Sequence, residues 1–355
     1  MVGARVPALA PCRFVGYNQY LRIWELECRR KSASGLIKAD LRPHSSKFSH
    51  LLIMELDWRY LMEPSLSTMW IQQRFDNLKD FFAAGRALGF KQFELGHTVR
   101  PEMFRGVQPG QQTISSIHAP CPANPGPWDY LASQDEGNRR QAVAQAKETI
   151  TLAQKLKAPI VILHMGKVAI DPSLEKRLRD LYNEGRKGTQ EYEDARWRLV
   201  EARARAQAQN LTAAARSLEE ISQYAQATGI RLGLENRYYY YEVPNIEEMS
   251  TLLTSSDPAT VFYWHDTGHA QNLENLGFTR HEEWLKAFAS RMAGVHLHDI
   301  VGLQDHRVAG KGEMNWPMIA FYLPAKAIRT CEFDWPHREE EIVSGVEYLR
   351  QMGCL

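Results

Sequence analysis

Short β-prone runs alternate with helical stretches along this chain from Leu66 to its end. Such alternation indicates repeated βα units, in which successive strands lie parallel in one sheet and are joined by helices. We predict eight strands: Leu66–Trp70, Gln92–Leu95, Ile114–His118, Ile160–His164, Arg231–Glu235, Val261–Asp266, Gly294–His298 and Ile328–Glu332. Eight units of this kind fit a closed α/β barrel of ordinary size, the (β/α)8 or TIM barrel.

Amphipathic stretches between the predicted strands support the helices of this barrel. Residues Phe75–Leu88 and Leu211–Ala227 each place apolar side chains on one face at helical spacing. The segment between the fourth and fifth strands is too long for a single crossover and holds two further helical stretches, Leu174–Arg186 and Glu191–Ala208. Because the charges of these stretches are of mixed sign, we expect a helical insertion on the surface rather than a nucleic-acid contact.

The first 60 residues show no clear period, in contrast to the rest of the chain. We therefore predict two parts, an N-terminal extension at residues 1–60 and a barrel domain at residues 61–355. Met62 opens the more regular region. The extension could be a small cap on the barrel, a poorly ordered arm or sequence upstream of the natural start.

The composition is that of a globular protein, with 43 Lys+Arg against 42 Asp+Glu in 355 residues. A net charge of +1 predicts no long-range attraction to DNA phosphates or anionic lipid. No stretch approaches the about 18 to 20 apolar residues that cross a bilayer. The five cysteines form no C-x-x-C pair, and the first residues make a poor secretory signal. We therefore expect a cytoplasmic protein without membrane segments or nucleic-acid partners.

Seven of the eight predicted strands end in an ionisable residue or carry one close to the end. In a parallel barrel these strand ends converge on one mouth, where catalytic groups of such enzymes lie. The residues concerned are Glu94, His118, His164, Glu235, Asp266, His296 with His298, and Glu332.

A single buried histidine or glutamate is usually structural, but so many at one mouth would repel one another or lose their hydration unless cations held them together. Imidazole nitrogens mixed with carboxylate oxygens suit Zn²⁺, Mn²⁺, Fe²⁺ or Co²⁺. The central prediction is therefore a divalent transition metal. Two further features lie near the predicted mouth, a run of four tyrosines at 238–241 and a Gly-Lys-Gly loop at 310–312, which is weak evidence for phosphate binding.

Three motifs carry a resemblance to a known family: Leu-Glu-Asn-Arg-Tyr at 234–238, Tyr-Trp-His-Asp-Thr-Gly-His-Ala at 263–270, and His-Leu-His-Asp at 296–299 followed by Asp-His-x-x-x-Gly-x-Gly. Over residues 62–352 the sequence resembles the xylose-isomerase-like TIM-barrel superfamily, which contains sugar isomerases and epimerases, inosose dehydratases and class II AP endonucleases. It is most similar to proteins described as sugar phosphate isomerase/epimerase.

The resemblance to the epimerases implies one metal held by Glu235, Asp266, His296 and Glu332, with Glu235 and Glu332 as the acid/base pair. The similarity to the AP endonucleases implies further ligands. His118 and His164 would bind another metal that Glu235 bridges, and His269, Asp305 and His306 would bind a third. That family has Asp-x-His where Asp305 and His306 are adjacent here, so one to three ions are expected.

The resemblance implies an isomerase or epimerase that removes a proton next to the carbonyl of a sugar, sugar phosphate or related polyol. The alternatives are a metal-dependent phosphoester hydrolase of the AP-endonuclease type, an inosose-dehydratase-like lyase and a non-catalytic binding barrel. A homo-oligomer is also expected from the superfamily. The candidate substrate-binding residues are His269, His298, Arg237, Tyr238, Arg307 and Lys311.

Overall fold

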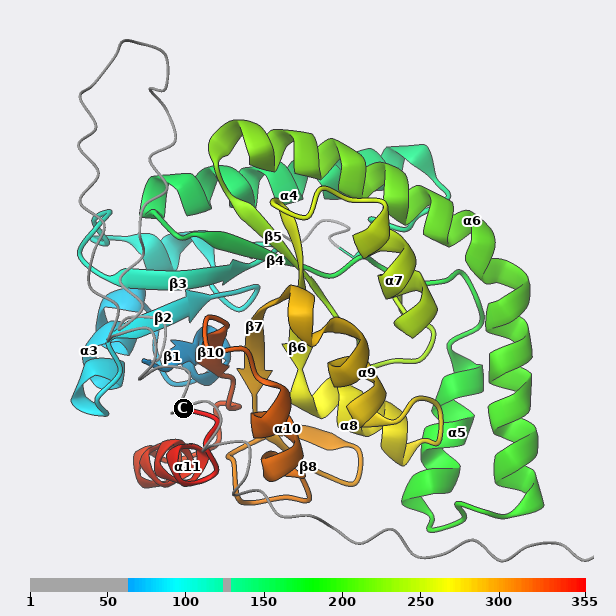
Figure 1. The fold of residues 1–355 in the computed structure, drawn as a ribbon. Helices are drawn as coiled ribbons and strands as arrows, with labels where there is room; N and C mark the ends of the chain where they lie inside the picture. The colour runs from blue at the N-terminus through cyan, green and yellow to red at the C-terminus, as the bar shows by residue number, and fades with distance from the viewer. Residues whose placement is uncertain (1–62, 124–128) are drawn as a thin grey trace, which may run out of the picture. The chain divides into compact units, whose positions relative to one another are not determined.

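The computed structural model of the protein describes residues 63–123 and 129–355, so the predicted extension at residues 1–60 lies outside the described part. Eight parallel strands close into a barrel in the order β1-β10-β7-β6-β5-β4-β3-β2, which confirms the predicted (β/α)8 fold (Figure 1). The barrel strands are β1 (Ser65–Ser67), β2 (Gln92–Leu95), β3 (Thr113–His118), β4 (Ile160–Leu163), β5 (Arg231–Glu235), β6 (Val261–Asp266), β7 (Met292–Leu297) and β10 (Ile328–Cys331).

The first strand is shorter than its prediction. The chain leaves the sheet after Ser67 and forms a 3-10 helix, η1 (Thr68–Ile71), because the Ser67 hydroxyl accepts a hydrogen bond from the Met69 N–H. The prediction of a strand through Trp70 is therefore wrong. His164, His298 and Glu332 likewise come directly after their strands rather than within them.

Helices follow the strands and cover the outside of the barrel. The first, α3, begins three residues later than predicted, because the Asn77 side chain caps it by accepting the Asp80 N–H. An antiparallel hairpin that the pattern did not predict, β8 (Asp299–Val301) and β9 (Gln304–Arg307), follows β7. The helices are α3 (Leu78–Ala87), α4 (Glu136–Leu156), α5 (Ser173–Asn183), α6 (Gln190–Thr228), α7 (Ile246–Thr254), α8 (Thr267–Asn275), α9 (His281–Phe288), α10 (Trp316–Tyr322) and α11 (Glu339–Gln351), with 3-10 turns η2 (Pro101–Phe104) and η3 (Ala289–Arg291).

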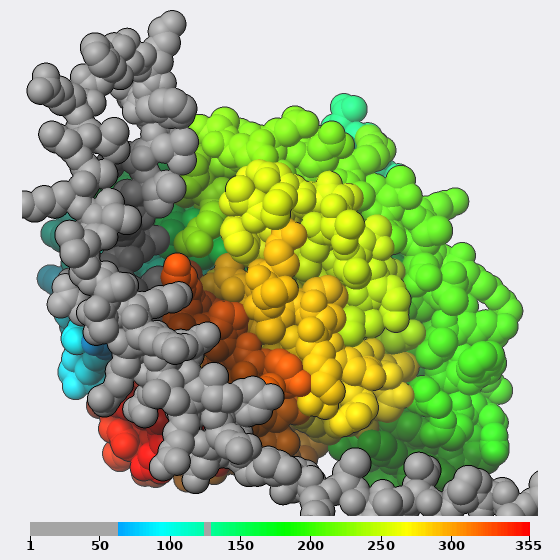
Figure 2. All heavy atoms as spheres, viewed as in Figure 1, coloured from blue at the N-terminus to red at the C-terminus, as the bar shows by residue number. Residues whose placement is uncertain are grey.

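The insertion between β4 and β5 consists of α5 and α6, which lie side by side at the edge of the barrel (Figure 1). The prediction of two helices at Glu191–Ala208 and Leu211–Ala227 is wrong, because α6 runs unbroken for 39 residues. Asn210 lies between the two predicted helices, and an asparagine can interrupt a helix by bonding to its backbone. Here its side chain bonds to the Ala132 carbonyl and the Ala169 N–H, outside the helix. In the space-filling view the α5–α6 segment (green) borders the α7–α8 segment (yellow) on the visible face (Figure 2).

A plug of apolar side chains fills the barrel interior beneath the strand ends. Trp264 is the largest side chain of this cluster, which also includes Ile160 and Ile162. A Cβ atom at Gly294 would lie 2.2 Å from the Trp264 ring, so the indole needs a glycine there. The polar residues above this plug therefore sit on a dry, close-packed base. None of the helices in the described ranges is both long and apolar enough to cross a membrane.

Candidate metal centre

Four of the predicted ligands meet at the carboxyl ends of neighbouring strands. Glu235 and Asp266 end β5 and β6, His296 lies in β7, and Glu332 follows β10. All four are buried, and one ligand atom of each lies within 4.8 Å of one ligand atom of every other. The strand order places β5, β6, β7 and β10 next to one another, which explains why these residues converge. The group is compact enough to share one cation.

The His296 ring lies between two sets of carboxylates. Its Nδ1 is 2.9 Å from Glu235 Oε1, 3.2 Å from Glu332 Oε2 and 3.5 Å from Asp266 Oδ2. On the other side, Nε2 is 3.0 Å from Glu94 Oε1. With Nε2–H donated to Glu94, Nδ1 would present its lone pair to a cation held between it and the three other carboxylates. A carboxylate behind a ligating histidine is the usual outer partner of a metal site.

The electrostatics of this group depend on charges that cannot reach water. Burial disfavours the charged form of His296, but Glu332, Glu94 and Glu235 outweigh it and raise its pKa well above the ordinary value. Burial similarly opposes ionisation of Glu332, yet the charges of His296 and His306 lower its pKa to about 2. His296 and His164 hold the pKa of Glu235 well below normal in the same way. Three ionised carboxylates around one imidazole form a negative, buried site that a divalent cation would neutralise.

His118 and His164 form a second group against the same glutamate. Their Nε2 atoms are 2.7 Å apart and lie 3.1 Å and 2.6 Å from Glu235 Oε2. His118 Nδ1 is 2.9 Å from the Ala119 carbonyl, to which it can only donate, so its Nε2 presents a lone pair to the group. Glu235 therefore reaches His296 with one oxygen and this pair with the other, as a bridging carboxylate would.

The third predicted group is also assembled, although its two adjacent residues depart from the family pattern. Ligand atoms of His269, Asp305 and His306 lie within 4.8 Å of one another. His306 has a left-handed backbone conformation with φ of +53°, which allows it and Asp305 to face the same side. Its Nδ1 is 3.1 Å from Asp305 Oδ1, and His269 Nε2 is 3.8 Å from Asp305 Oδ2.

The predicted substrate-binding residues fall into different places. His298 is buried, with Nε2 3.0 Å from Asp266 Oδ2 and Nδ1 accepting the His306 N–H, so both ring nitrogens are engaged within the protein. Arg237 is buried too, where its guanidinium pairs with Glu242 at 2.9 Å.

Tyr238 and Arg307 are partly exposed and line one cavity beside the third group. Lys311 is exposed and does not line that cavity. The structure thus leaves Tyr238, His269 and Arg307 as the best placed of the six for substrate contact.

Several polar residues at the mouth were not predicted as site residues. Glu94 lies behind His296, with an oxygen 3.0 Å from its Nε2. The indication in the sequence was its position near the end of the second strand. Asn236 joins β5 to β6, since its amide donates to the Asp266 carbonyl at 2.9 Å and accepts the Asp266 N–H at 2.8 Å. His97 follows β2, has its ring 5.6 Å from that of His118 and a pKa that burial lowers to about 4. The only indication in the sequence was a histidine two residues after a predicted strand.

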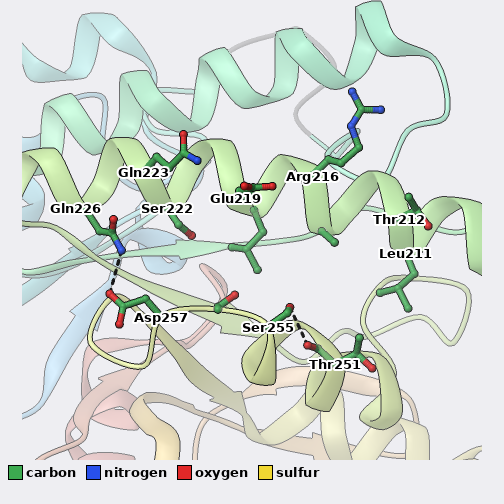
Figure 3. A pocket seen from close by; sticks show the side chains of 13 residues that line it. Leu211, Thr212, Arg216, Glu219, Ser222, Gln223, Gln226, Thr251, Ser255 and Asp257 are labelled. Carbon is green, nitrogen blue, oxygen red and sulfur yellow. Dashed lines mark hydrogen bonds between the residues drawn. The ribbon is translucent and has the colours of Figure 1, made fainter.

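A cavity of about 660 Å³ lies away from this mouth, between α6 and α7 (Figure 3). Arg216, Glu219 and Asp257 contribute charges to its lining, which holds no histidine or cysteine. Asp257 accepts a hydrogen bond from Gln226 and precedes the start of β6, at the opposite end of the strand from the candidate ligands. This cavity therefore has neither the chemistry nor the position of a metal site.

Comparisons with known proteins agree with the fold. The family described as xylose isomerase-like TIM barrel matches residues 82–352. The search of curated proteins found no significant match. Among solved structures, a D-tagatose 3-epimerase-like protein is 18% identical, with 82% of this chain and 97% of that chain covered and a TM-score of 0.57. D-psicose 3-epimerase from Clostridium cellulolyticum H10, solved with D-tagatose, is 15% identical over 82% and 99%, also at 0.57. The IolI protein, with a bound zinc atom, is 13% identical over 82% and 98% at 0.58.

Proposed function

Because the chain belongs to the xylose isomerase-like TIM-barrel family, we propose that it is a divalent-metal-dependent isomerase or epimerase of a sugar or related polyol. The observation that carries the proposal is the buried group of three carboxylates and one imidazole at the barrel mouth. The similar solved structures include proteins named as sugar epimerases, one of them solved with D-tagatose and another similar structure with zinc.

Glu235, Asp266, His296 and Glu332 would hold the cation next to the bound substrate. When bound, a divalent cation would polarise the substrate carbonyl and stabilise the enediolate charge. The donor set, three carboxylates and one imidazole, fits Mn²⁺, Co²⁺, Fe²⁺ or Zn²⁺.

Glu235 and Glu332 are the proposed acid/base pair. Two strands, β6 and β7, separate β5 from β10 in the barrel, which supports an approach of the two carboxylates to the substrate from different sides. Epimerisation needs a proton acceptor on one face of the carbon and a donor on the other. With its low pKa, Glu332 is ionised and able to take a proton, while His269 would orient a hydroxyl group of the substrate.

The experiment is a screen of the metal-loaded protein against small ketoses and aldoses in deuterated water, with NMR detection of deuterium at carbon. We expect exchange next to the carbonyl of at least one sugar. Failure to exchange any C–H on the whole panel, with metal present by elemental analysis, would contradict the proposal.

The second candidate is an AP-endonuclease-like phosphoester hydrolase, favoured by the His118–His164–Glu235 and His269–Asp305–His306 groups. Nicking of DNA with an abasic site in the presence of zinc would support it. Elemental analysis of His118→Ala and His164→Ala tests the second metal directly. We expect each variant to lose about one equivalent of metal relative to the wild type, and unchanged stoichiometry in both would show that the two histidines are not ligands.

A cytoplasmic location remains part of the proposal. Cys121, Cys331 and Cys354 are free and buried among the described residues. Burial raises the pKa of the Cys121 and Cys331 thiols, so these groups are neutral packing residues. Free thiols of this kind are compatible with a reducing compartment.

A further inference from the structure

A cavity of about 450 Å³ adjoins the candidate metal centre on one side. It lies between Tyr238, which follows β5, the β8–β9 hairpin and the loop 334–337 after β10. Asp305 and His306 belong both to this cavity and to the third candidate ligand group. A substrate bound at the metal centre can therefore extend past Asp305 and His306 into this cavity.

The size of the cavity suggests that the substrate has more than one ring. Cavities of roughly 300 to 1,000 Å³ take drug-sized ligands of several rings. The reacting sugar has to sit over Glu235, Asp266, His296 and Glu332, none of which lines this cavity. The space beside Tyr238 is thus additional to the space that the reacting sugar needs.

The wall formed by Tyr238 is held rigidly. Its hydroxyl donates to the Leu303 carbonyl across the cavity. The guanidinium of Arg179, on the inserted helix α5, lies 4.3 Å from the centre of the Tyr238 ring and donates to the Tyr238 carbonyl at 3.0 Å. Buried Glu175, one turn earlier, binds Arg179 and accepts the N–H groups of the residues after Tyr239 at 3.1 and 3.2 Å. A phenol ring fixed in this way offers a flat face to the C–H groups of a sugar.

The charges around the cavity favour an uncharged ligand. Two carboxylates, Asp305 and Asp334, line it. The basic groups of the lining are already engaged, since Arg307 donates to Gln304 and His306 lies 3.1 Å from Asp305. Of the other two cations considered for a phosphate, Arg237 is buried against Glu242 and Lys311 lies outside the lining. A phosphate site needs net positive charge, and the two carboxylates of this lining offset its basic groups.

We infer that this cavity binds a second, uncharged sugar ring of the substrate, so that the protein acts on a ketose carrying a glycosyl group rather than on a free monosaccharide or a sugar phosphate. The inference rests on the proposed function and specifies the substrate class for the same site.

Three ketoses that share one reacting end test this inference: fructose, fructose 6-phosphate and isomaltulose, which carries a glucosyl group on the same oxygen. Binding of each to the full-length, metal-loaded protein is measured by titration calorimetry. We expect isomaltulose to bind about tenfold more tightly than fructose, and fructose 6-phosphate no more tightly than fructose. Equal binding of fructose and isomaltulose, tightest binding of the phosphate, or no measurable binding of isomaltulose would overturn the inference.

A matched pair of variants locates the effect. Tyr238→Ala should remove the preference for isomaltulose, whereas Tyr239→Ala, in the same run but outside the cavity lining, should keep it. A preference that survives Tyr238→Ala counts against the inference. Deuterium exchange measured on the same sugars tests the proposed function independently of the binding preference. Preferential binding of isomaltulose without deuterium exchange would contradict the proposed isomerase or epimerase activity but support the second sugar site. Exchange on fructose without that preference would support the activity and contradict the second sugar site.

Discussion

Glu332 Oε2 lies 3.2 Å from His296 Nδ1 and 3.6 Å from His306 Nε2, with its pKa lowered to about 2. Glu332→Gln keeps the shape of this side chain but removes its charge and its ability to accept a proton. We expect turnover to fall by about 10² to 10⁴-fold or more, with an unchanged circular dichroism spectrum. Exposed Glu340→Gln is the control. A Glu332→Gln enzyme with the wild-type rate would refute the acid/base assignment.

Glu94 acts behind His296 rather than on the substrate. It accepts from the Ser116 hydroxyl at 2.7 Å and faces His296 Nε2 at 3.0 Å, so it fixes the orientation of the ring. Glu94→Gln should weaken metal binding by about 10 to 100-fold without lowering the number of sites at saturating metal. Competition with a fluorescent chelator measures this affinity, and an unchanged value would show that Glu94 does not support the site.

These residues differ in how far the sequence could predict them. Glu235 and Asp266 end their strands and His296 lies one residue before the end of its own. Because these strands are neighbours, the parallel pattern alone brings the three residues to one edge. The contact of Glu94 with His296 crosses the barrel interior between β2 and β7, which are not neighbours, and depends on the barrel closing with a particular register. Periodicity along the chain contains no signal for such a contact.

At the scale of elements, the inserted helices α5 and α6 are bonded to the loop that follows β5. Arg203 of α6 is buried, binds both oxygens of Glu248 at 3.0 and 2.6 Å, and donates to the carbonyls of Tyr240 and Glu242 at 2.7 and 2.9 Å. Through these bonds the surface insertion holds the segment that carries Arg237 and Tyr238. The helical insertion therefore also supports the loop at the barrel mouth.

Arg203→Met should lower the free energy of unfolding by about 3 to 5 kcal/mol, because it leaves Glu248 buried and unpaired. Arg205→Met on the same helix removes only an exposed i,i+4 pair with Glu201 and should change stability by about 0.5 kcal/mol or less. Urea denaturation compares the two variants. Equal stability of Arg203→Met and Arg205→Met would mean that the buried pair does not anchor the loop.

The element boundaries show which local signals override periodicity. The hydroxyl of Ser67 ends β1 early and the amide of Asn77 delays α3, because short polar side chains compete for backbone groups. The amide of Asn210 does the opposite, since its bonds to Ala132 and Ala169 leave the α6 backbone intact. Each outcome depends on whether a tertiary partner is available, which the sequence of one segment does not contain.

For the molecule as a whole, every strand of the closed barrel lies between Ser65 and Cys331, and every candidate ligand lies between His118 and Glu332. β1 completes the barrel, because Leu66 pairs with Cys331 on one side and Phe93 on the other. A chain of residues 62–355 should therefore fold and bind metal with the stoichiometry of the full chain.

Removal of residues 1–75 tests whether β1 is needed to close the barrel. It deletes β1 and exposes the edges of β10 and β2, so we expect aggregation or loss of cooperative unfolding. Circular dichroism melts and elemental analysis of the two truncated chains give the comparison. If residues 62–355 failed to fold while the full chain did, the predicted boundary near residue 60 would be wrong, and the barrel would depend on the extension for its stability.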